Sequence, residues 1–287
     1  MKKKVKIIVL KTAGTNNDIE TAEAFKLVGA EPEIIHINRF LRNEKDFQDY
    51  KILAIPGGFS YGDDISAGKV FANKLMHKLK TEIIKFANQG KLMLGICNGF
   101  QVLVKAGLLP FLDGKQSVTL TNNDSGKFEC RWVHLKTVRR FASSQVTNSQ
   151  IQHGLSSKNY TKCHCDDKIA NLWTKNLPET IQLPVAHAEG KFFCNEDVIR
   201  KLEQQSLTVL KYVDENGNEA GYPHNPNGSV SNIAGIVNTD GNILGLMPHP
   251  ERFISKYQHP QWTRKKSVEP YGLVIFKNAV EYAKKSL

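Results

Sequence analysis

The chain has 287 residues, of which 40% are hydrophobic, so it can bury a sizeable core in one large domain. No apolar run reaches the roughly 18 residues of a membrane-spanning helix, and we expect no membrane partner. The net charge of +11 would suit nucleic acid, but the basic residues are scattered without interleaved aromatic residues, which favours an anionic substrate or an acidic protein partner instead.

The first half of the chain alternates short apolar runs with segments of helical periodicity. The predicted strands are residues 5–10, 32–37, 51–55 and 91–96. The predicted helices are residues 18–28, 70–88 and 99–106. The first run is too short for a signal peptide and lacks a cleavage-site pattern. This alternation predicts an α/β fold with a doubly wound, mostly parallel sheet, whose sites lie at the carboxyl ends of the strands.

The second half is richer in strands. The predicted strands are residues 117–120, 128–138, 207–213, 233–237 and 243–247, and residues 183–190 read as a strand that runs into a turn. The predicted helices are residues 195–204 and 271–285. Asn238-Thr239-Asp240-Gly241-Asn242 predicts a hairpin between the last two strands. Neither repeats nor a low-complexity linker interrupt the chain, so we expect a single domain over residues 1–287.

Residues 139–178 are polar and weakly patterned, and we interpret them as an insertion within that domain. They contain Cys163-His164-Cys165, which differs from the Cys-x-x-Cys spacing of ordinary zinc sites. A metal site is the alternative, but a plain loop is the better prediction. Five unevenly spaced cysteines in a chain with a large core predict reduced thiols and a cytoplasmic location.

Cys97 lies between Gly95 and Gly99, at the junction of an apolar strand and a helical segment. Glycine permits a tight turn that a Cβ would obstruct. Such a strand–turn–helix elbow presents a nucleophile, and the helix N-terminus favours its thiolate form. The alternative is that Cys97 is a small buried hydrophobic residue. The flanking glycines and the preceding strand favour the nucleophile.

A thiol nucleophile needs a base and an orienting acid, and His249 with Glu251 is the best candidate pair. Pro248 and Pro250 should exclude a helix and hold the segment extended. Extended residues two apart project to the same side, which brings the carboxylate near the imidazole. The alternative is a surface loop.

Acyl transfer also needs hydrogen-bond donors for an oxyanion. The backbone amide of Asn98, directly after Cys97, is one candidate. The amide of Gly58, in Pro56-Gly57-Gly58 after the third predicted strand, is another. Without such a role this tripeptide would be an ordinary turn.

Five motifs together resemble the class I (triad) glutamine amidotransferases, and within them the branch of glutaminase subunits of phosphoribosylformylglycinamidine synthase. The motifs are Pro56-Gly57-Gly58-Phe59-Ser60-Tyr61-Gly62-Asp63, Gly95-Ile96-Cys97-Asn98-Gly99-Phe100-Gln101, Pro184-Val185-Ala186-His187-Ala188-Glu189-Gly190, Asn227-Gly228-Ser229 and Met247-Pro248-His249-Pro250-Glu251-Arg252. The resemblance runs from about residue 5 to residue 252, and the C-terminal helix is consistent with it. Residues 139–178 and an alanine at 188, where glycine is common, depart from the pattern.

The resemblance implies a flavodoxin-like fold and a role for each matching residue. These roles are nucleophile for Cys97, base for His249, orienting acid for Glu251, oxyanion donors for Gly58 and Asn98, and contact with bound glutamine for Gln101 and His187. It also implies that ammonia passes to a separate synthetase subunit, which converts formylglycinamide ribonucleotide to the amidine, and that a small accessory subunit is a further candidate partner. The chain has no Gly-x-x-x-x-Gly-Lys-Ser/Thr loop, so ATP and magnesium are expected on the synthetase and no cofactor on this chain.

Two other functions remain open at this stage. One is a DJ-1-like cysteine hydrolase, which shares the elbow but does not require glutamine or the His249–Glu251 pair. The other is a catalytically idle subunit that regulates a partner. Glutamate release from glutamine would distinguish all three.

Overall fold

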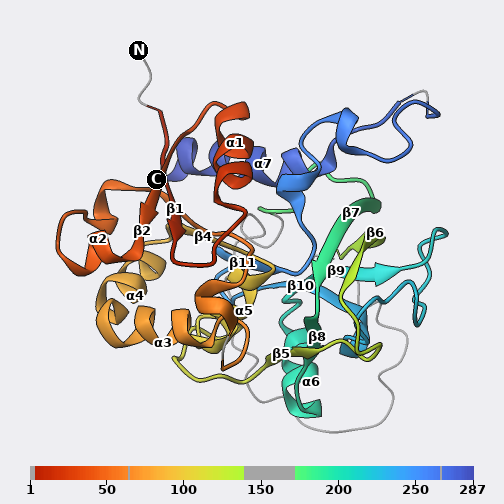
Figure 1. Ribbon diagram of the computed structural model, residues 1–287, viewed down its shortest axis with the longest axis horizontal. Helices are drawn as coiled ribbons and strands as arrows, with labels where there is room; N and C mark the ends of the chain where they lie inside the picture. Colours follow the sequence, from red (N-terminus) through yellow and green to blue (C-terminus); the bar gives the residue numbers. More distant parts are fainter. Residues whose placement is uncertain (1–3, 64, 139–171, 266) are drawn as a thin grey trace, which may run out of the picture.

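The structure is a computed structural model that describes residues 4–63, 65–138, 172–265 and 267–287 (Figure 1). Its described residues form a nine-stranded sheet with the order β2-β1-β3-β4-β11-β10-β9-β6-β7 and a two-stranded sheet, β5-β8. The strands are β1 (Lys6–Lys11), β2 (Glu31–His36), β3 (Ile52–Ile55), β4 (Leu92–Ile96), β5 (Thr119–Asn122), β6 (Glu129–Thr137), β7 (Thr180–His187), β8 (Glu189–Phe193), β9 (Thr208–Val213), β10 (Ile233–Val237) and β11 (Ile243–Leu246). The helices are α1 (Asp18–Leu27), α2 (Ile37–Leu41), α3 (Lys69–Lys78), α4 (Lys80–Asn88), α5 (Asn98–Lys105), α6 (Glu196–Gln204) and α7 (Tyr271–Ser286).

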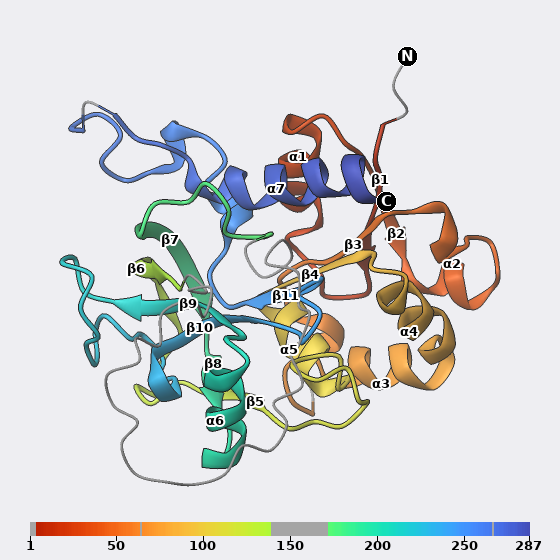
Figure 2. The same ribbon diagram turned by 180° about the vertical axis from the view of Figure 1, so that it is seen from behind.

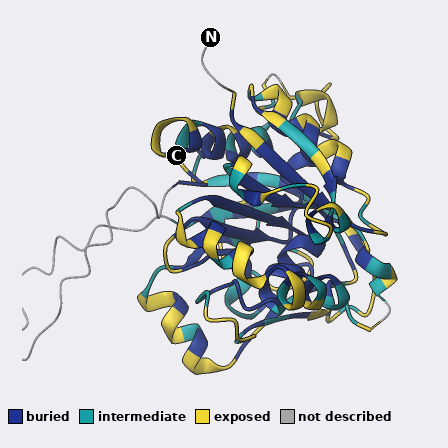
Figure 3. Ribbon diagram, turned by 90° about the vertical axis from the view of Figure 1, so that its left-hand side faces the viewer, coloured by how far each residue is buried: buried dark blue, intermediate teal, exposed yellow. Residues whose placement is uncertain are grey.

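Five of the nine strands of the large sheet form a parallel part that helices cover on both faces. Strands β2, β1, β3, β4 and β11 run parallel to one another. Helices α1 and α7 lie on one face, and α3, α4 and α5 lie on the other (Figures 1 and 2). β3, β4 and β11 are buried along their whole length, as the continuous apolar runs of a doubly covered sheet require (Figure 3). The predicted α/β class with a doubly wound, mostly parallel sheet is confirmed.

Beyond β11 the sheet becomes antiparallel. The predicted hairpin is present, because β10 pairs antiparallel with β11. β9, β6 and β7 continue the antiparallel half, and β5 pairs with β8 beside it. The sheet is therefore mixed, and the strand-rich second half of the sequence supplies most of its antiparallel part.

The helix predicted over residues 70–88 is instead two helices. α3 ends at Lys78 and α4 begins at Lys80, because Leu79 has φ −129° and ψ 18°, outside the helical region. Leu79 is itself buried. Apolar periodicity alone did not reveal this break, since it continues through both helices.

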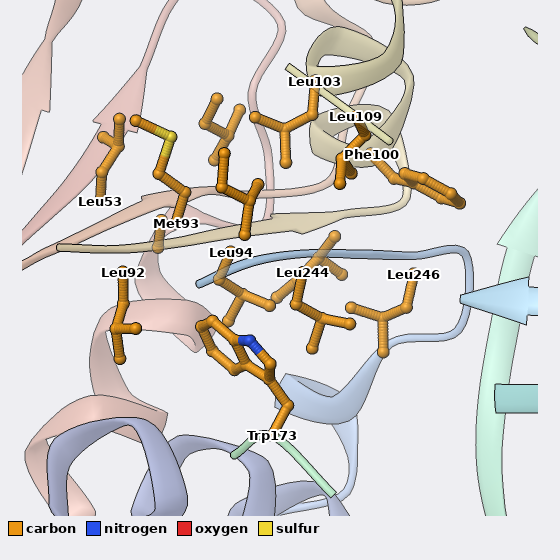
Figure 4. Packing of buried hydrophobic residues seen from close by; sticks show 14 of the residues in the cluster. Leu53, Leu92, Met93, Leu94, Phe100, Leu103, Leu109, Trp173, Leu244 and Leu246 are labelled. Atoms are coloured by element: carbon orange, nitrogen blue, oxygen red, sulfur yellow. The ribbon is translucent and has the colours of Figure 1, made fainter. Parts of the chain in front are cut away.

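Residues 172–178 of the predicted insertion pack into the core. Trp173 is 1% exposed and lies against Leu94 and Leu244 on the face of the sheet that α7 covers (Figure 4). Its indole N–H donates to the carbonyl of Gly241 at 2.9 Å, and Asn278 donates to the Trp173 carbonyl at 3.0 Å. Residues 139–171, with Cys163-His164-Cys165, lie outside the described part of the chain. Within that part, no helix is long and apolar enough to cross a membrane.

Candidate active site

Cys97 lies at a sharp turn between β4 and α5, as the sequence predicted for this segment. Its backbone has φ 51° and ψ −105°, a conformation that L-residues rarely adopt and that is typical of a strained functional turn. A Cβ on Gly95 would lie 2.6 Å from the carbonyl oxygen of Gly99, and one on Gly99 would collide with the carbonyl of Ile55. The two glycines therefore allow the elbow to pack against β3.

The order of the strands brings His249 to this elbow. β11 lies beside β4 and parallel to it, so both strands end at the same edge of the sheet. The Cys97 N–H donates to the carbonyl of Leu246 at 2.8 Å, which fixes the two ends together. The segment that follows β11, which contains His249, therefore lies next to Cys97.

His249 and Glu251 form a buried pair. Nδ1 of His249 and Oε1 of Glu251 are 2.6 Å apart, and the two side chains are 1% and 0% exposed. The expectation that this segment stays extended through Glu251 is wrong, because Pro250–Arg252 forms a single 3-10 turn. Proline fits the first position of such a turn, where its missing N–H is not needed. The turn, not an extended strand, points the carboxylate at the imidazole.

The pair is electrostatically coupled to Cys97. Burial by itself lowers the pKa of His249, but the charges of Glu251 and Cys97 together raise that pKa to about 10. Nε2, the ring nitrogen turned away from Glu251, is buried, and its interaction with the Cys97 side chain is a further cause of the raised pKa. At neutral pH the imidazole is therefore protonated, and a cation beside the sulfur stabilises a thiolate.

Gly57 lies against both His249 and Cys97. A Cβ at this position would lie 2.9 Å from Cε1 of His249 and 3.5 Å from Cβ of Cys97. Real Cβ contacts are longer than the first of these distances, so any side chain at position 57 must push the imidazole away from its place.

We expect Gly57→Ala to lower kcat about 10- to 100-fold, because a displacement of a reacting group by less than 1 Å is enough to cost that much. The measurement is steady-state glutamate release from glutamine. Gly221→Ala is the matched control, since a Cβ there meets no atom within 4 Å. Wild-type turnover by Gly57→Ala would contradict the tight fit.

The two residues whose amides are expected to bind the oxyanion lie on different segments of the chain. Asn98 is the first residue of α5, so its N–H has no acceptor within the helix. Gly58 follows β3 and has φ 143°, and a Cβ there would lie 2.7 Å from the amide nitrogen of Asn16 and from the carbonyl oxygen of Gly14. Position 58 therefore requires glycine for both its backbone angle and its packing.

A pocket of about 240 Å³ opens onto Cys97. Five of the seven sequence-predicted site residues line it: Gly58, Cys97, Gln101, His187 and His249. Glu251 lies behind His249, and the Asn98 side chain turns aside to hydrogen-bond Asp63 and Gln101 at 3.2 and 3.0 Å. The described residues contain no group of three or more side chains suited to hold a metal ion.

His187 lines the pocket as a neutral acceptor. Burial and the positive charge of His249 lower the pKa of His187 to about 3. Asn123 donates its amide N–H groups to the carbonyls of Lys127 and His187, so its oxygen accepts from Nδ1 of His187, 3.1 Å away. Nδ1 thus carries the proton, and Nε2 is a buried lone pair without a hydrogen-bond partner among the described residues.

Sequence reasoning assigned no role to several polar residues of this pocket. Asp63 and Glu189 lie close enough that the charge of Glu189 adds to burial in raising the pKa of Asp63. Arg252 and Asn17 line the same pocket. Asp63, Glu189 and Arg252 fall inside the motifs quoted above, so their position in a motif was a signal for them. Asn17 lies outside all five motifs, and nothing in the sequence pointed to it.

Known proteins resemble the chain over nearly its whole length. The family model of the CobB/CobQ-like glutamine amidotransferase domain matches residues 4–158 and 148–283. Phosphoribosylformylglycinamidine synthase subunit PurQ of Dehalococcoides mccartyi is 43% identical over 285 residues, which cover 98% of each chain. The subunit of the same name from Methanococcus maripaludis is 40% identical over 296 residues, again covering 98% of each chain.

Solved structures agree with these sequence matches. A chain of the PurLQS structure from Thermotoga maritima has a TM-score of 0.66 and 29% identity, and the match covers 98% of this chain and 99% of that one. A glutamine amidotransferase from Thermotoga maritima, at 14% identity and a TM-score of 0.50, shares the fold.

Proposed function

This chain belongs to the CobB/CobQ-like glutamine amidotransferase family, and we propose that it is the glutaminase subunit of a phosphoribosylformylglycinamidine synthase. The observation that carries this proposal is the buried His249–Glu251 pair beside Cys97 at the strand–helix elbow. The pocket above the thiol has carboxylates and a guanidinium in its wall, which suits a zwitterionic amino acid.

The first half of the reaction forms a thioester. The Cys97 thiolate attacks the side-chain amide carbon of glutamine, and a carbon–sulfur bond forms while the carbonyl oxygen becomes negatively charged. The amides of Gly58 and Asn98 donate hydrogen bonds to this oxygen. Protonated His249 gives its proton to the amide nitrogen, the carbon–nitrogen bond breaks, and ammonia leaves.

The second half returns the enzyme to its starting state. Neutral His249 accepts a proton from water as the water oxygen attacks the thioester carbon. The tetrahedral intermediate collapses with cleavage of the carbon–sulfur bond, which releases glutamate and restores the thiolate beside a protonated imidazole. Glu251 keeps Nδ1 protonated and oriented throughout both halves.

The ammonia is used by a partner. The PurLQS structure shows a similar chain of Thermotoga maritima in an assembly of that name. We propose that this chain likewise supplies ammonia to a synthetase subunit, which converts formylglycinamide ribonucleotide to the amidine, and that a small accessory subunit completes the complex. ATP and magnesium then bind to the synthetase. The free thiols among the described cysteines suit the reduced cytoplasm as the site of this reaction.

The same observation argues against both alternatives. An idle regulatory subunit has no use for a histidine and a carboxylate buried together against a strained cysteine, because such groups are costly to bury. A DJ-1-like hydrolase would require neither glutamine nor the His249–Glu251 pair, so the burial of this pair beside Cys97 favours the amidotransferase. Glutamate release from glutamine, measured with and without the synthetase and its ligands, decides between them, and a chain that releases none even in the complex would refute the proposal.

We expect the isolated chain to release glutamate about 10²- to 10³-fold more slowly than the complex, because the loss of one oxyanion donor costs this much. Phe59 follows Gly58, is 47% exposed and lines the pocket. A partner that contacts Phe59 can rotate the Gly58 amide toward the oxyanion. The isolated chain and the complex are compared by glutamate release and by the pH dependence of Cys97 alkylation. Equal rates would rule out activation by the partner. A faster rate in the complex with an unchanged alkylation profile would support a movement of the Gly58 amide.

A further inference from the structure

We propose that Asn17 is a positioning residue of this glutaminase, which holds the Glu251 carboxylate and ties it to the loop that carries Gly58. The proposal rests on the proposed function, since it concerns the same reaction. Asn17 directly precedes α1 and is 1% exposed. Asparagine at this position normally accepts a hydrogen bond from the first turn of the helix, but the Asn17 side chain makes no such bond. Its amide group instead contacts Glu251 and Arg252.

Both ends of the Asn17 amide have a partner next to the triad. Nδ2 donates to Oε1 of Glu251 at 3.2 Å, and Oδ1 accepts from Nη2 of Arg252 at 3.2 Å. A guanidinium can only donate, so the amide oxygen must face Arg252 and the nitrogen must face Glu251. The flipped amide would place donor against donor and acceptor against acceptor. Arg252 thus fixes the direction in which Asn17 donates.

Glu251 depends on this donor because it is completely buried. Its Oε1 accepts from His249 and from Asn17, whereas Oε2 has no hydrogen-bond partner among the described residues. The terminal torsion of a glutamate is broad and easily rotated. The Asn17 bond therefore selects the carboxylate oxygen that meets the imidazole.

The backbone of Asn17 connects the residue that holds Glu251 to the loop that carries Gly58. Its N–H donates to the carbonyl of Gly57 at 3.2 Å, and Thr15 forms an antiparallel bridge with Gly58. Its carbonyl accepts from the amide and the hydroxyl of Thr21 at 3.1 and 2.7 Å, in the first turn of α1. A shift of the Gly58 loop therefore moves the residue that holds Glu251, so the two halves of the site are mechanically connected.

The test compares Asn17→Ala and Asn17→Asp with the wild-type chain, each in complex with the synthetase. We expect Asn17→Ala to lower kcat for glutamate release about 10- to 100-fold, as loss of a group that orients a site residue does. KM should change less than about twofold, because the bond acts on the chemical step. Asn17→Asp keeps the shape but sets a carboxylate oxygen against Glu251, and it should be slower still at neutral pH.

Asn195→Ala is the matched control. Asn195 precedes α6, and its side chain accepts from the Val198 N–H at 2.9 Å, so this variant loses a real helix cap and should lower the melting temperature without changing kcat. Ammonia-dependent synthesis by each complex measures folding and assembly independently of glutamine hydrolysis. We expect this activity to be unchanged in both Asn17 variants.

Three results would overturn the role of Asn17. The first is a kcat for Asn17→Ala within about twofold of wild type, against the loss expected for a positioning group. The second is an Asn17→Asp variant at least as active as Asn17→Ala, which would show that shape matters and hydrogen-bond donation does not. The third is an equal loss of glutamine- and ammonia-dependent synthesis, which indicates a purely structural role. A wild-type complex that releases no glutamate would refute the proposed function, and the role of Asn17 with it.

Discussion

Cys97→Ala is expected to abolish glutamine-dependent synthesis by the complex and to leave ammonia-dependent synthesis intact. Without the sulfur no thioester can form, while a synthetase on another polypeptide can still use ammonia from solution. Alanine fits the elbow, because the strain at Cys97 lies in its backbone and the flanking glycines are unchanged. The measurement is product formation by the complex with glutamine or with an ammonium salt as the nitrogen source.

Cys194→Ala is the control for this experiment. Cys194 is also buried, and burial raises the pKa of its thiol to about 11, so it is a poor nucleophile. This variant should keep both activities. A Cys97→Ala complex that loses both activities equally would count against a separate glutaminase, and one that keeps glutamine-dependent synthesis would exclude Cys97 as the nucleophile.

Glu251→Gln is expected to lower kcat on the order of 10⁴-fold, the cost of removing the charge of a triad carboxylate in a serine protease. The charge of Glu251 is one of the causes that raise the pKa of His249 against burial. With a neutral amide in its place, only the interactions with Cys97 still oppose burial, so the pKa of His249 falls. The imidazole is then a weaker cationic partner for the sulfur and is less often protonated when the ammonia must leave.

Two measurements test the role of Glu251. The first is the turnover number, with Glu179→Gln as control, since Glu179 is exposed and pairs with Lys136 at the surface. The second is Cys97 alkylation as a function of pH. In the wild type the imidazolium persists up to about pH 10, because the pKa of His249 is raised to that value. In Glu251→Gln it is lost at lower pH, so rapid alkylation should require more alkaline solution. An unchanged turnover number would contradict the assignment.

The elements of the site were readable from the sequence because each depends on nearby residues. The elbow follows from two glycines on either side of Cys97 after an apolar run. Most strands and helices follow from apolar periodicity, with boundaries that differ from the structure by a few residues, whereas α2 and β8 were not predicted. The break between α3 and α4 was missed because the periodicity is the same on both sides of Leu79.

The assembly of the site was decided by tertiary structure. Strand order places β11 against β4, which carries His249 to Cys97 from far along the chain. The 3-10 turn at Pro250–Arg252, not the extended backbone expected from its prolines, aims Glu251 at the imidazole.

Asn17 and Trp173 are two further residues whose contacts depend on the tertiary structure. The sequence analysis assigned no role to Asn17, whose side chain bridges Glu251 and Arg252 because α1 packs against the Pro250–Arg252 turn. Trp173, in a segment read as an insertion, fills the core against β4 and β11. Local geometry and chemistry could be read from neighbouring residues, because backbone sterics and periodicity act over a few residues. Partners distant in sequence were chosen by strand register and side-chain packing, which exist only once the chain has folded.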